Sequence, residues 1–346
     1  MKAAVFKAVG EPLAIEDVAV PEPGPSDLIL KVTACGICGS DLHMTDVCDH
    51  SGGMSPLPTG AIMGHEFAGE VVETGRDVAA DWRAGMRACA LPYIACGQCA
   101  QCLAGNGRWC ASSTYMGLGK LAGAYAEYVR VGAFEALPLP DAVDDSAGAM
   151  VEPLAVGLHA VNKAKLQPGD TVLVIGAGPI GLAIALWCRF FGARHVVVSD
   201  LVADRVARAA KFGATDAIDA AKENAVGRFK KIAGARPDVV FDAVGVPGSQ
   251  QLAMDAAPAG GRVVVAGACM QPDRILPVKA ITKELQVNYV FMYLKQDFAF
   301  AVDMLAQGRI DPSAMVTDTV GFDAFPAAFE ALKTPTTQCK VMLVPD

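Results

Sequence analysis

Residues 171–181 read Thr-Val-Leu-Val-Ile-Gly-Ala-Gly-Pro-Ile-Gly. The β-branched apolar run at their start predicts a buried strand, and the apolar run after the glycines predicts a helix. Gly176 permits a tight turn, Gly178 lets the backbone approach a pyrophosphate, and Gly181 lets the helix pack close to the strand. Free N–H groups at the start of the helix bind phosphate. This G-x-G-x-x-G stretch therefore predicts a strand–turn–helix unit that holds a dinucleotide.

Elements of alternating type follow this turn. Helices are predicted over 179–191, where Pro179 and Ile180 join the glycines as expected cofactor-binding residues, and over 205–212. Further strands are predicted over 195–199, 239–242 and 262–266. Alternation of strands and helices indicates a parallel sheet with helices on both faces. The chain from Thr171 onward is thus predicted to form a doubly wound α/β domain of the Rossmann type.

Asp200 stands at the end of the strand that follows the glycine-rich turn. Its carboxylate is placed to accept hydrogen bonds from an adenosine ribose, and its charge repels an added 2′-phosphate, so NAD is favoured over NADP. A helix cap or a turn residue is the alternative interpretation of Asp200. Arg205 either stacks near the adenine or pairs with a neighbouring carboxylate.

The first 153 residues have a different pattern, in which short β-like runs are separated by turns rich in proline and glycine. These runs are 3–6, 28–33, 68–73 and 126–131. A chain of 346 residues exceeds what one hydrophobic core usually organises, and a composition of 53% hydrophobic and 19% charged residues suits large cores. The sequence therefore predicts two domains, the first of them rich in β-structure.

Two motifs in this first part carry possible metal ligands. Cys38 lies in Gly-Ile-Cys-Gly-Ser-Asp-Leu-His, residues 36–43, and His65 lies in Gly-His-Glu-Phe-Ala-Gly, residues 64–69. A thiolate, an imidazole and a nearby carboxylate suit an open zinc site, which keeps one position for a substrate oxygen and lowers the pKa of a bound hydroxyl. Together with the dinucleotide turn, they predict hydride transfer at zinc.

Four cysteines form a second metal-binding pattern. Cys96, Cys99, Cys102 and Cys110 have the spacing C-x2-C-x2-C-x7-C on a loop that contains several glycines. Four thiolates at this spacing can surround a tetrahedral ion with no open position, which is the structural type of zinc site. An iron–sulfur cluster is disfavoured, because the ferredoxin run has a three-residue last gap and a following proline, whereas Ala111 follows here.

Charge and hydropathy argue against other classes of protein. A net charge of -8 without a long basic run disfavours nucleic acid as a partner. Residues 172–188 carry no charge, but their glycines and Pro179 divide them into a strand and a helix, which disfavours a membrane span. The N-terminus lacks the apolar core and cleavage site of a signal peptide, and the clustered cysteines suit metal better than disulfides, so a cytoplasmic location is expected.

The order of these motifs resembles that of the zinc-containing medium-chain alcohol and polyol dehydrogenases along the whole chain. The motifs that carry the resemblance are 36–43, 64–69, the four-cysteine segment, Glu152-Pro-Leu-Ala155 and 176–181. The resemblance implies a GroES-like, β-rich catalytic domain of residues 1–153 and 296–346, with a structural zinc lobe at about 89–112. It also implies an NAD-binding domain of residues 154–295 and assembly into a homotetramer or homodimer.

The resemblance assigns roles to the ligand positions. Cys38 and His65 become ligands of the catalytic zinc, and the third protein ligand falls at Glu66 or Glu152. Liver-type alcohol dehydrogenases have a cysteine where this chain reads Met-Val-Glu-Pro, residues 150–153, so the chain is more similar to the sorbitol and threonine dehydrogenases. Asp41 is expected to orient a zinc ligand rather than to titrate.

The same resemblance implies a proton path. Ser40 takes the alcohol proton and His43 passes it toward solvent; the alternative is that both residues only cap the following helix and fill surface space. The sequence thus predicts an NAD-dependent zinc alcohol dehydrogenase acting on a secondary alcohol or a polyol. The alternatives are oxidation of a hydroxy amino acid as in the threonine dehydrogenases, a catalytically silent zinc- and nucleotide-binding protein, and a zinc-free quinone reductase. Retention of the catalytic positions argues against silence, and the two metal patterns argue against a quinone reductase.

Overall fold

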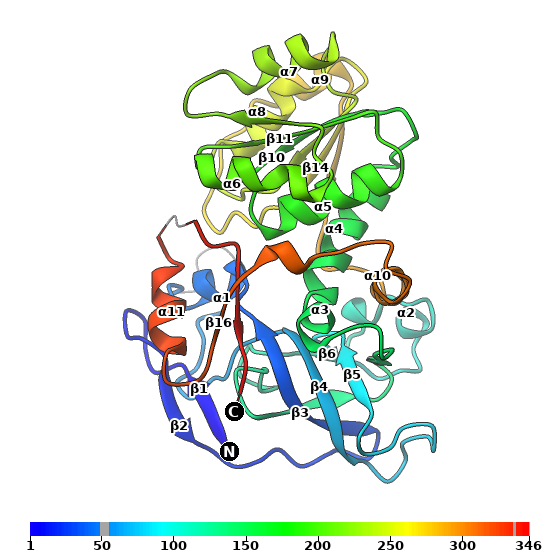
Figure 1. The fold of residues 1–346 in the computed structure, drawn as a ribbon, viewed down its shortest axis with the longest axis vertical. Coiled ribbons are helices and arrows are strands. Elements are labelled where there is room, and N and C mark those ends of the chain that lie inside the picture. The colour runs from blue at the N-terminus through cyan, green and yellow to red at the C-terminus, as the bar shows by residue number, and fades with distance from the viewer. Residues whose placement is uncertain (49–54, 335–336, 346) are drawn as a thin grey trace. The chain divides into compact units, whose positions relative to one another are not determined.

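The computed structural model describes residues 1–48, 55–334 and 337–345. The chain forms two compact units, one of Met1–Glu152 with Leu294–Asp346 and one of Pro153–Tyr293. The second unit is inserted between the two segments of the first, as the colours of Figure 1 show. Helix α4 (Val151–Lys163) begins in the first unit and continues into the second.

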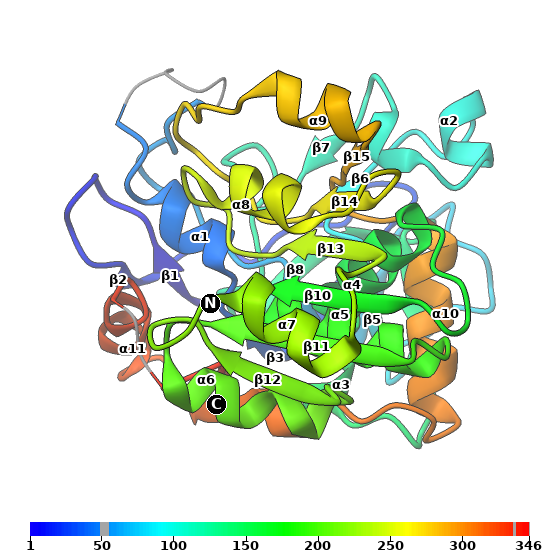
Figure 2. The same cartoon turned by 90° about the horizontal axis from the view of Figure 1, so that it is seen from above.

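The second unit is built on a parallel sheet. Within the described residues, its strands lie in the order β12 (Asp216–Asp219), β11 (His195–Asp200), β10 (Thr171–Ile175), β13 (Val239–Asp242), β14 (Arg262–Val265) and β15 (Gln286–Tyr289). Each strand is parallel to its neighbours, and Figure 2 shows them side by side. The chain moves outward from β10 through β11 to β12, then crosses to β13 and continues to β15. This is the Rossmann order, whose switch point lies at the carboxyl ends of β10 and β13.

Helices pack on the strands of this sheet. They are α5 (Pro179–Phe190), α6 (Ala203–Arg208), α7 (Ala225–Ala233), α8 (Ser249–Ala256) and the 3-10 turn η2 (Ala209–Phe212), whereas α9 (Pro277–Lys283) packs on α8. Phe229 of α7 and Ala253 of α8 share a core with Leu173 and Val240 of the sheet. Helix α5 packs on β10 and β11 and buries every residue from 181 to 188. The predicted α/β class of this unit is confirmed.

The first unit is rich in β-structure. Its largest sheet runs in the order β16 (Val316–Val320), β17 (Lys340–Leu343), β3 (Asp27–Gly36), β4 (Glu66–Thr74), β5 (Arg87–Ala90) and β9 (Ala136–Pro138), and β8 (Tyr128–Gly132) also pairs with β3. Strands β16 and β17 are parallel, whereas β17 is antiparallel to β3 and β3 to β4. Both segments of the chain therefore contribute to one sheet.

Shorter elements complete the first unit. They are β1 (Lys2–Val5), β2 (Ala14–Asp17), β6 (Tyr93–Ile94), β7 (Thr114–Tyr115), α1 (Gly39–Met44), α2 (Ala100–Leu103), η1 (Gly107–Trp109), α3 (Asp145–Ala149), α10 (Lys295–Ala306), η3 (Ser313–Met315) and α11 (Phe325–Ala331). The core of this unit includes Phe67 of β4, Tyr125 before β8, and Phe325 and Phe329 of α11. Helix α11 thus closes the core with two aromatic side chains.

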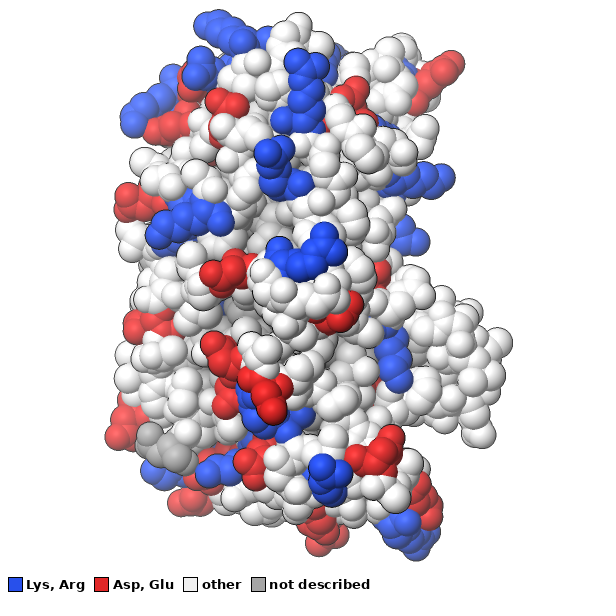
Figure 3. Space-filling model, turned by 45° about the vertical axis from the view of Figure 1, so that its right-hand side comes forward, with Lys and Arg blue, Asp and Glu red and all other residues white. Residues whose placement is uncertain are grey.

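Two surface properties bear on the predictions from composition. No helix in the described parts of the chain is long and apolar enough to cross a membrane, and residues 172–188 divide between β10 and α5. On the face drawn in Figure 3, acidic and basic side chains are interspersed.

Candidate metal centres and nucleotide-binding turn

Sheet register brings the two metal-ligand motifs of the first unit together. Strand β3 ends at Gly36, which pairs with Glu66 at the start of the antiparallel strand β4. Cys38 follows β3 and His65 precedes β4, so the two motifs lie at the same end of the paired strands β3 and β4. One ligand atom each from Cys38, His65 and Glu66 lies within 4.8 Å of the other two. This set is called the Cys38 group below.

The start of α1 fixes Cys38. Cys38 is the N-cap residue of this helix, with extended backbone angles of φ -94° and ψ 149°. Its N–H donates to Asp41 Oδ2 at 3.4 Å, and Ser40 Oγ donates to its sulfur at 3.3 Å. Ser40 and His43 are exposed and lie one helical turn apart on α1, so their side chains are neighbours.

Asp41 orients the imidazole of His65. His65 Nδ1 lies 3.2 Å from Asp41 Oδ1, and the Asp41 side chain is buried. A carboxylate on one ring nitrogen fixes the tautomer and leaves the other nitrogen for a metal. Burial by itself lowers the pKa of His65, but the negative charges of Asp41 and Cys38 raise this pKa well above its ordinary value. The contact between Asp41 and His65 is consistent with the expected role of Asp41 in orienting a zinc ligand.

Glu66 is held by a residue that the sequence analysis missed. Lys340 Nζ on β17 donates to Glu66 Oε1 at 2.8 Å, to Glu66 Oε2 at 2.6 Å and to the carbonyl of Ile37 at 2.9 Å. Lys340 and Glu66 are each only 1% exposed. Gly36 lies between them, and a Cβ at this position would overlap the Glu66 carboxylate. Burial alone would lower the pKa of Lys340, but the charge of Glu66 raises it above its ordinary value.

The donor set and its charges fit zinc. A thiolate, an imidazole and a carboxylate are ligand types of catalytic zinc sites. With Cys38 bound as a thiolate, Cys38, Asp41 and Glu66 would carry three negative charges, which Lys340 and one Zn²⁺ together would balance. Glu152 at the start of α4 is also buried but does not belong to the Cys38 group.

The four cysteines of the first unit also lie together, with their sulfur atoms within 4.8 Å of one another. The sulfur–sulfur distances are 3.5 Å for Cys99–Cys102, 3.6 Å for Cys110–Cys96 and 3.9 Å for Cys96–Cys102. Sulfurs placed tetrahedrally at about 2.3 Å from a zinc ion lie about 3.8 Å apart. The geometry of these thiols therefore fits a closed, structural zinc site.

Local backbone structure brings the four thiols together. Gly97 and Gly105 have φ values of 70° and 75°, which side chains disfavour, and they flank the short helix α2. Backbone N–H groups of Gln98 and Cys99 lower the pKa of the Cys96 thiol, so this thiol is prepared to bind metal as thiolate.

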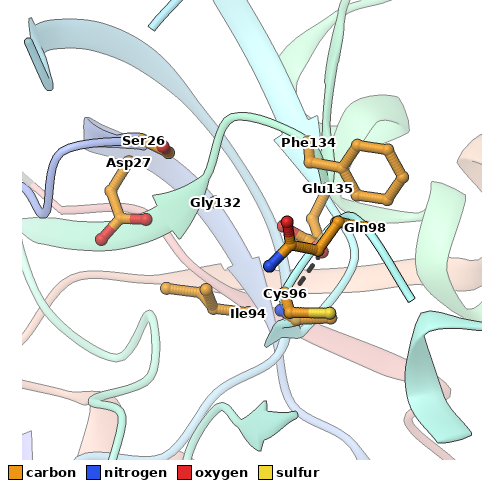
Figure 4. Close-up of a pocket in the computed structure, with 10 residues that line it drawn as sticks. Ser26, Asp27, Ile94, Cys96, Gln98, Gly132, Phe134 and Glu135 are labelled. Atoms are coloured by element: carbon orange, nitrogen blue, oxygen red, sulfur yellow. Dashed lines mark hydrogen bonds between the residues drawn. The ribbon is translucent and has the colours of Figure 1, made fainter. Parts of the chain in front are cut away.

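A cavity of about 320 Å³ adjoins this segment. Figure 4 shows its lining, which is Ser26, Asp27, Ile94, Ala95, Cys96, Gly97, Gln98, Gly132, Phe134 and Glu135. Burial raises the pKa of Glu135 to about 7, and Glu135 Oε1 accepts a hydrogen bond from the Ala95 N–H at 3.3 Å. Cys96 is the one metal-ligand candidate in this lining, so the cavity belongs to the four-cysteine segment and not to the Cys38 group.

The glycine-rich turn of the second unit has the geometry that a pyrophosphate needs. Gly176 has φ 102°, and a Cβ at Gly181 would overlap the Gly176 carbonyl oxygen, so both positions require glycine. A Cβ at Gly178 would meet no atom within 4 Å, which leaves this backbone open to a ligand. Pro179 is the first residue of α5, a position whose N–H is not needed for the helix, and Ile180 follows it. The turn therefore fits a dinucleotide phosphate at a helix N-terminus.

Asp200 ends β11 beside this turn. Its Oδ2 accepts a hydrogen bond from the Ala177 N–H at 2.7 Å, and its Oδ1 accepts one from the Val202 N–H at 2.9 Å. A carboxylate has about four acceptor sites, so the two oxygens can still bind ribose hydroxyls. Asp200 thus has the turn role that was the alternative interpretation, and its ribose role stays a prediction. Arg205 lies half-buried on the following helix α6.

Comparison with known proteins agrees with this architecture. The model of the alcohol dehydrogenase GroES-like domain matches residues 24–141, and that of the zinc-binding dehydrogenase family matches residues 179–307. The sorbitol dehydrogenase of Bacillus subtilis is 32% identical over 100% of this chain and 98% of its own length. An L-threonine 3-dehydrogenase of Aeromonas hydrophila is 33% identical over 95% of this chain and 95% of its own length.

A solved structure extends the agreement to the fold. The alcohol dehydrogenase TADH from Thermus sp. ATN1 is 30% identical, with 100% of both chains covered and a TM-score of 0.90. Identity at this level over the full length, together with both family models, establishes the relationship that the motifs suggested. The chain belongs to the zinc-containing medium-chain dehydrogenases.

Proposed function

We propose that this protein is an NAD-dependent zinc alcohol dehydrogenase that transfers a hydride between NAD and a secondary alcohol or polyol. The observation that carries the proposal is the Cys38 group, in which Asp41 and Lys340 hold the ligands. In the same chain, the turn at 176–181 is open to a phosphate. One motif without the other would support only metal binding or only nucleotide binding.

The proposed ligands divide into two sites. Cys38 and His65 hold the catalytic zinc with Glu66 as the third protein ligand, and Glu152 is the alternative third ligand. Cys96, Cys99, Cys102 and Cys110 hold the structural zinc. Zinc at the first site supplies Lewis acidity that makes a hydroxyl group easier to deprotonate, and NAD supplies the hydride acceptor. The chain's own residues then have to orient the alcohol and remove its proton.

A panel of substrates tests the proposal directly. NAD reduction is measured with secondary alcohols, diols, polyols and hydroxy amino acids, with threonine among the last. The proposal expects turnover of secondary alcohols or polyols, and a preference for threonine would favour the alternative of a hydroxy amino acid dehydrogenase. Absence of NAD reduction with every compound, in protein that contains two zinc ions per chain, would favour the silent alternative.

The proton path is proposed to run from Ser40 to His43. Ser40 lies beside the Cys38 sulfur and His43 lies one turn further on the exposed side of α1. We expect Ser40→Ala to lower kcat for alcohol oxidation about 100-fold, because general base catalysis contributes about that much or more. His43→Ala should lower kcat less, about 10-fold, because solvent can replace the outer end of a relay.

Steady-state kinetics across pH, with added small bases for His43→Ala, measure these effects. Zinc content and NADH binding serve as controls and should stay unchanged in both variants. Full activity of Ser40→Ala would restrict its hydroxyl to the hydrogen bond with Cys38 and contradict the path.

The proposed cofactor preference rests on Asp200. We expect a higher kcat/KM with NAD than with NADP, and Asp200→Ala should narrow this ratio by removing the charge that repels a 2′-phosphate. Asp200 also holds the N–H groups of Ala177 and Val202, so the variant should bind both nucleotides more weakly. The ratio of the two kcat/KM values is therefore the measurement. Equal kcat/KM values for the two nucleotides in the unmodified enzyme would overturn the assignment.

Assembly and location complete the proposal. We propose a homotetramer or homodimer, supported by apolar exposure near the sheet edge β15, where Ile281 of α9 is 71% exposed and Tyr289 of β15 is 65% exposed. A cytoplasmic location is supported by the cysteines, which are all free thiols. The proposed partner is a small-molecule alcohol or ketone.

A further inference from the structure

Tyr125 contacts Asp41, the buried carboxylate beside the Cys38 group. It lies between the four-cysteine segment and β8, is fully buried, and donates its hydroxyl hydrogen to Asp41 Oδ2 at 2.6 Å. The carbonyl of Gly36 lies at 3.4 Å from the same hydroxyl. The other oxygen of Asp41 contacts His65, so Tyr125 is linked to a proposed zinc ligand through Asp41.

The two oxygens of Asp41 have different partners. Oδ1 lies 3.2 Å from His65 Nδ1, whereas Oδ2 accepts the Tyr125 hydroxyl at 2.6 Å and the Cys38 N–H at 3.4 Å. The three atoms of a carboxylate head group form one rigid plane. A strong hydrogen bond to Oδ2 therefore also fixes Oδ1, and with it the ring of His65.

Packing holds the Tyr125 ring in place. Its centroid is 4.8 Å from that of Phe325 and 6.2 Å from that of Phe329, both on α11. On the side of the metal ligands the ring touches Gly64, where a Cβ would lie 2.5 Å from it, and Gly64 has φ 94°. The absence of a side chain at Gly64, directly before His65, thus leaves room for the ring.

We propose that Tyr125 is a positioning residue for the catalytic zinc, which acts through Asp41 to hold the imidazole of His65 in its ligating orientation. The inference rests on the proposed zinc site at Cys38 and His65. Partners of metal ligands that do not touch the metal commonly change its affinity by 10-fold to 100-fold when they are removed. A role limited to satisfying a buried carboxylate would change stability without changing zinc affinity.

Tyr125→Phe tests the proposal, because it removes the hydroxyl and keeps the ring in its aromatic contacts. We expect the dissociation constant of zinc at the Cys38 group to rise on the order of 10-fold, measured by competition with a coloured chelator. The visible spectrum of protein with cobalt at this site should also change, because the ligand field depends on the His65 orientation. Tyr93→Phe is the matched control: Tyr93 is a buried tyrosine of the same unit beside the four-cysteine segment, and its loss should leave this zinc unaffected.

A double-mutant cycle separates positioning from general damage. Asp41→Asn should weaken zinc binding at the first site, and adding Tyr125→Phe to it should weaken binding little further, because both act through one contact. A zinc affinity of Tyr125→Phe equal to that of the unmodified protein, with only a lower melting temperature, would overturn the inference. Unmodified protein that binds a single zinc, at the four cysteines, would instead refute the proposed function.

Discussion

Cys38→Ser is expected to abolish alcohol oxidation and to leave one zinc ion per chain instead of two. The thiolate is the softest donor of the Cys38 group, and a serine hydroxyl is a poor replacement for it at neutral pH. A metal that stabilises developing charge contributes several kcal/mol to the transition state, and about 4 kcal/mol corresponds to a loss of kcat/KM of about 1,000-fold. Elemental analysis and the rate of NAD reduction measure the two effects on the same sample.

Cys99→Ser is the matched control, since it also replaces a cysteine by serine in the first unit. Loss of a structural zinc lowers stability because metal binding and folding are coupled at such sites. We therefore expect a lower melting temperature in Cys99→Ser, and a smaller loss of initial activity than in Cys38→Ser. Retention of two zinc ions and normal turnover in Cys38→Ser would contradict the assignment of Cys38 as a ligand.

Short sequence motifs predicted much of this structure, because the conformation that each motif requires depends only on residues close to it in the sequence. The turn at 176–181 requires glycine for reasons that lie within one strand and one helix, and the four cysteines lie within one loop. The strand predicted over 28–33 forms the longer β3, and the helix predicted over 205–212 divides into α6 and the turn η2.

Contacts between distant segments were not predictable from the pattern. Lys340 reaches Glu66 because β17 pairs with β3, and nothing near Lys340 in the sequence reports this register. Tyr125 reads as one more aromatic residue in an apolar run. The edge strands β12 and β15 were also missed, since Asp-Ala-Ile-Asp and Gln-Val-Asn-Tyr lack the apolar runs of the central strands.

The buried ion pair of Lys340 and Glu66 is expected to contribute strongly to the stability of the protein. Removing one partner of a buried ion pair costs about 3–5 kcal/mol, because the other charge stays buried without compensation. We expect Lys340→Met to destabilise the protein by about this amount, measured by denaturant unfolding. Glu66→Gln in the same chain should recover much of this loss, because it removes the uncompensated charge.

The loss of stability in Lys340→Met depends on whether zinc is bound at the Cys38 group. If Glu66 is a zinc ligand, zinc at the first site partly neutralises its carboxylate, and Lys340→Met then costs less in loaded protein than in protein without this zinc. Protein that carries Cys38→Ser provides the state without zinc at the Cys38 group, while zinc stays bound at the four cysteines. A cost of Lys340→Met that is the same in both backgrounds would remove Glu66 from the metal and leave Glu152 as the third ligand. A smaller cost in the zinc-loaded protein than in the Cys38→Ser background would assign Glu66. The other hydrogen bond of Lys340 goes to the neutral carbonyl of Ile37, and the charge of Cys38, which also stabilises Lys340, is absent from the Cys38→Ser background and so cannot make the cost there larger.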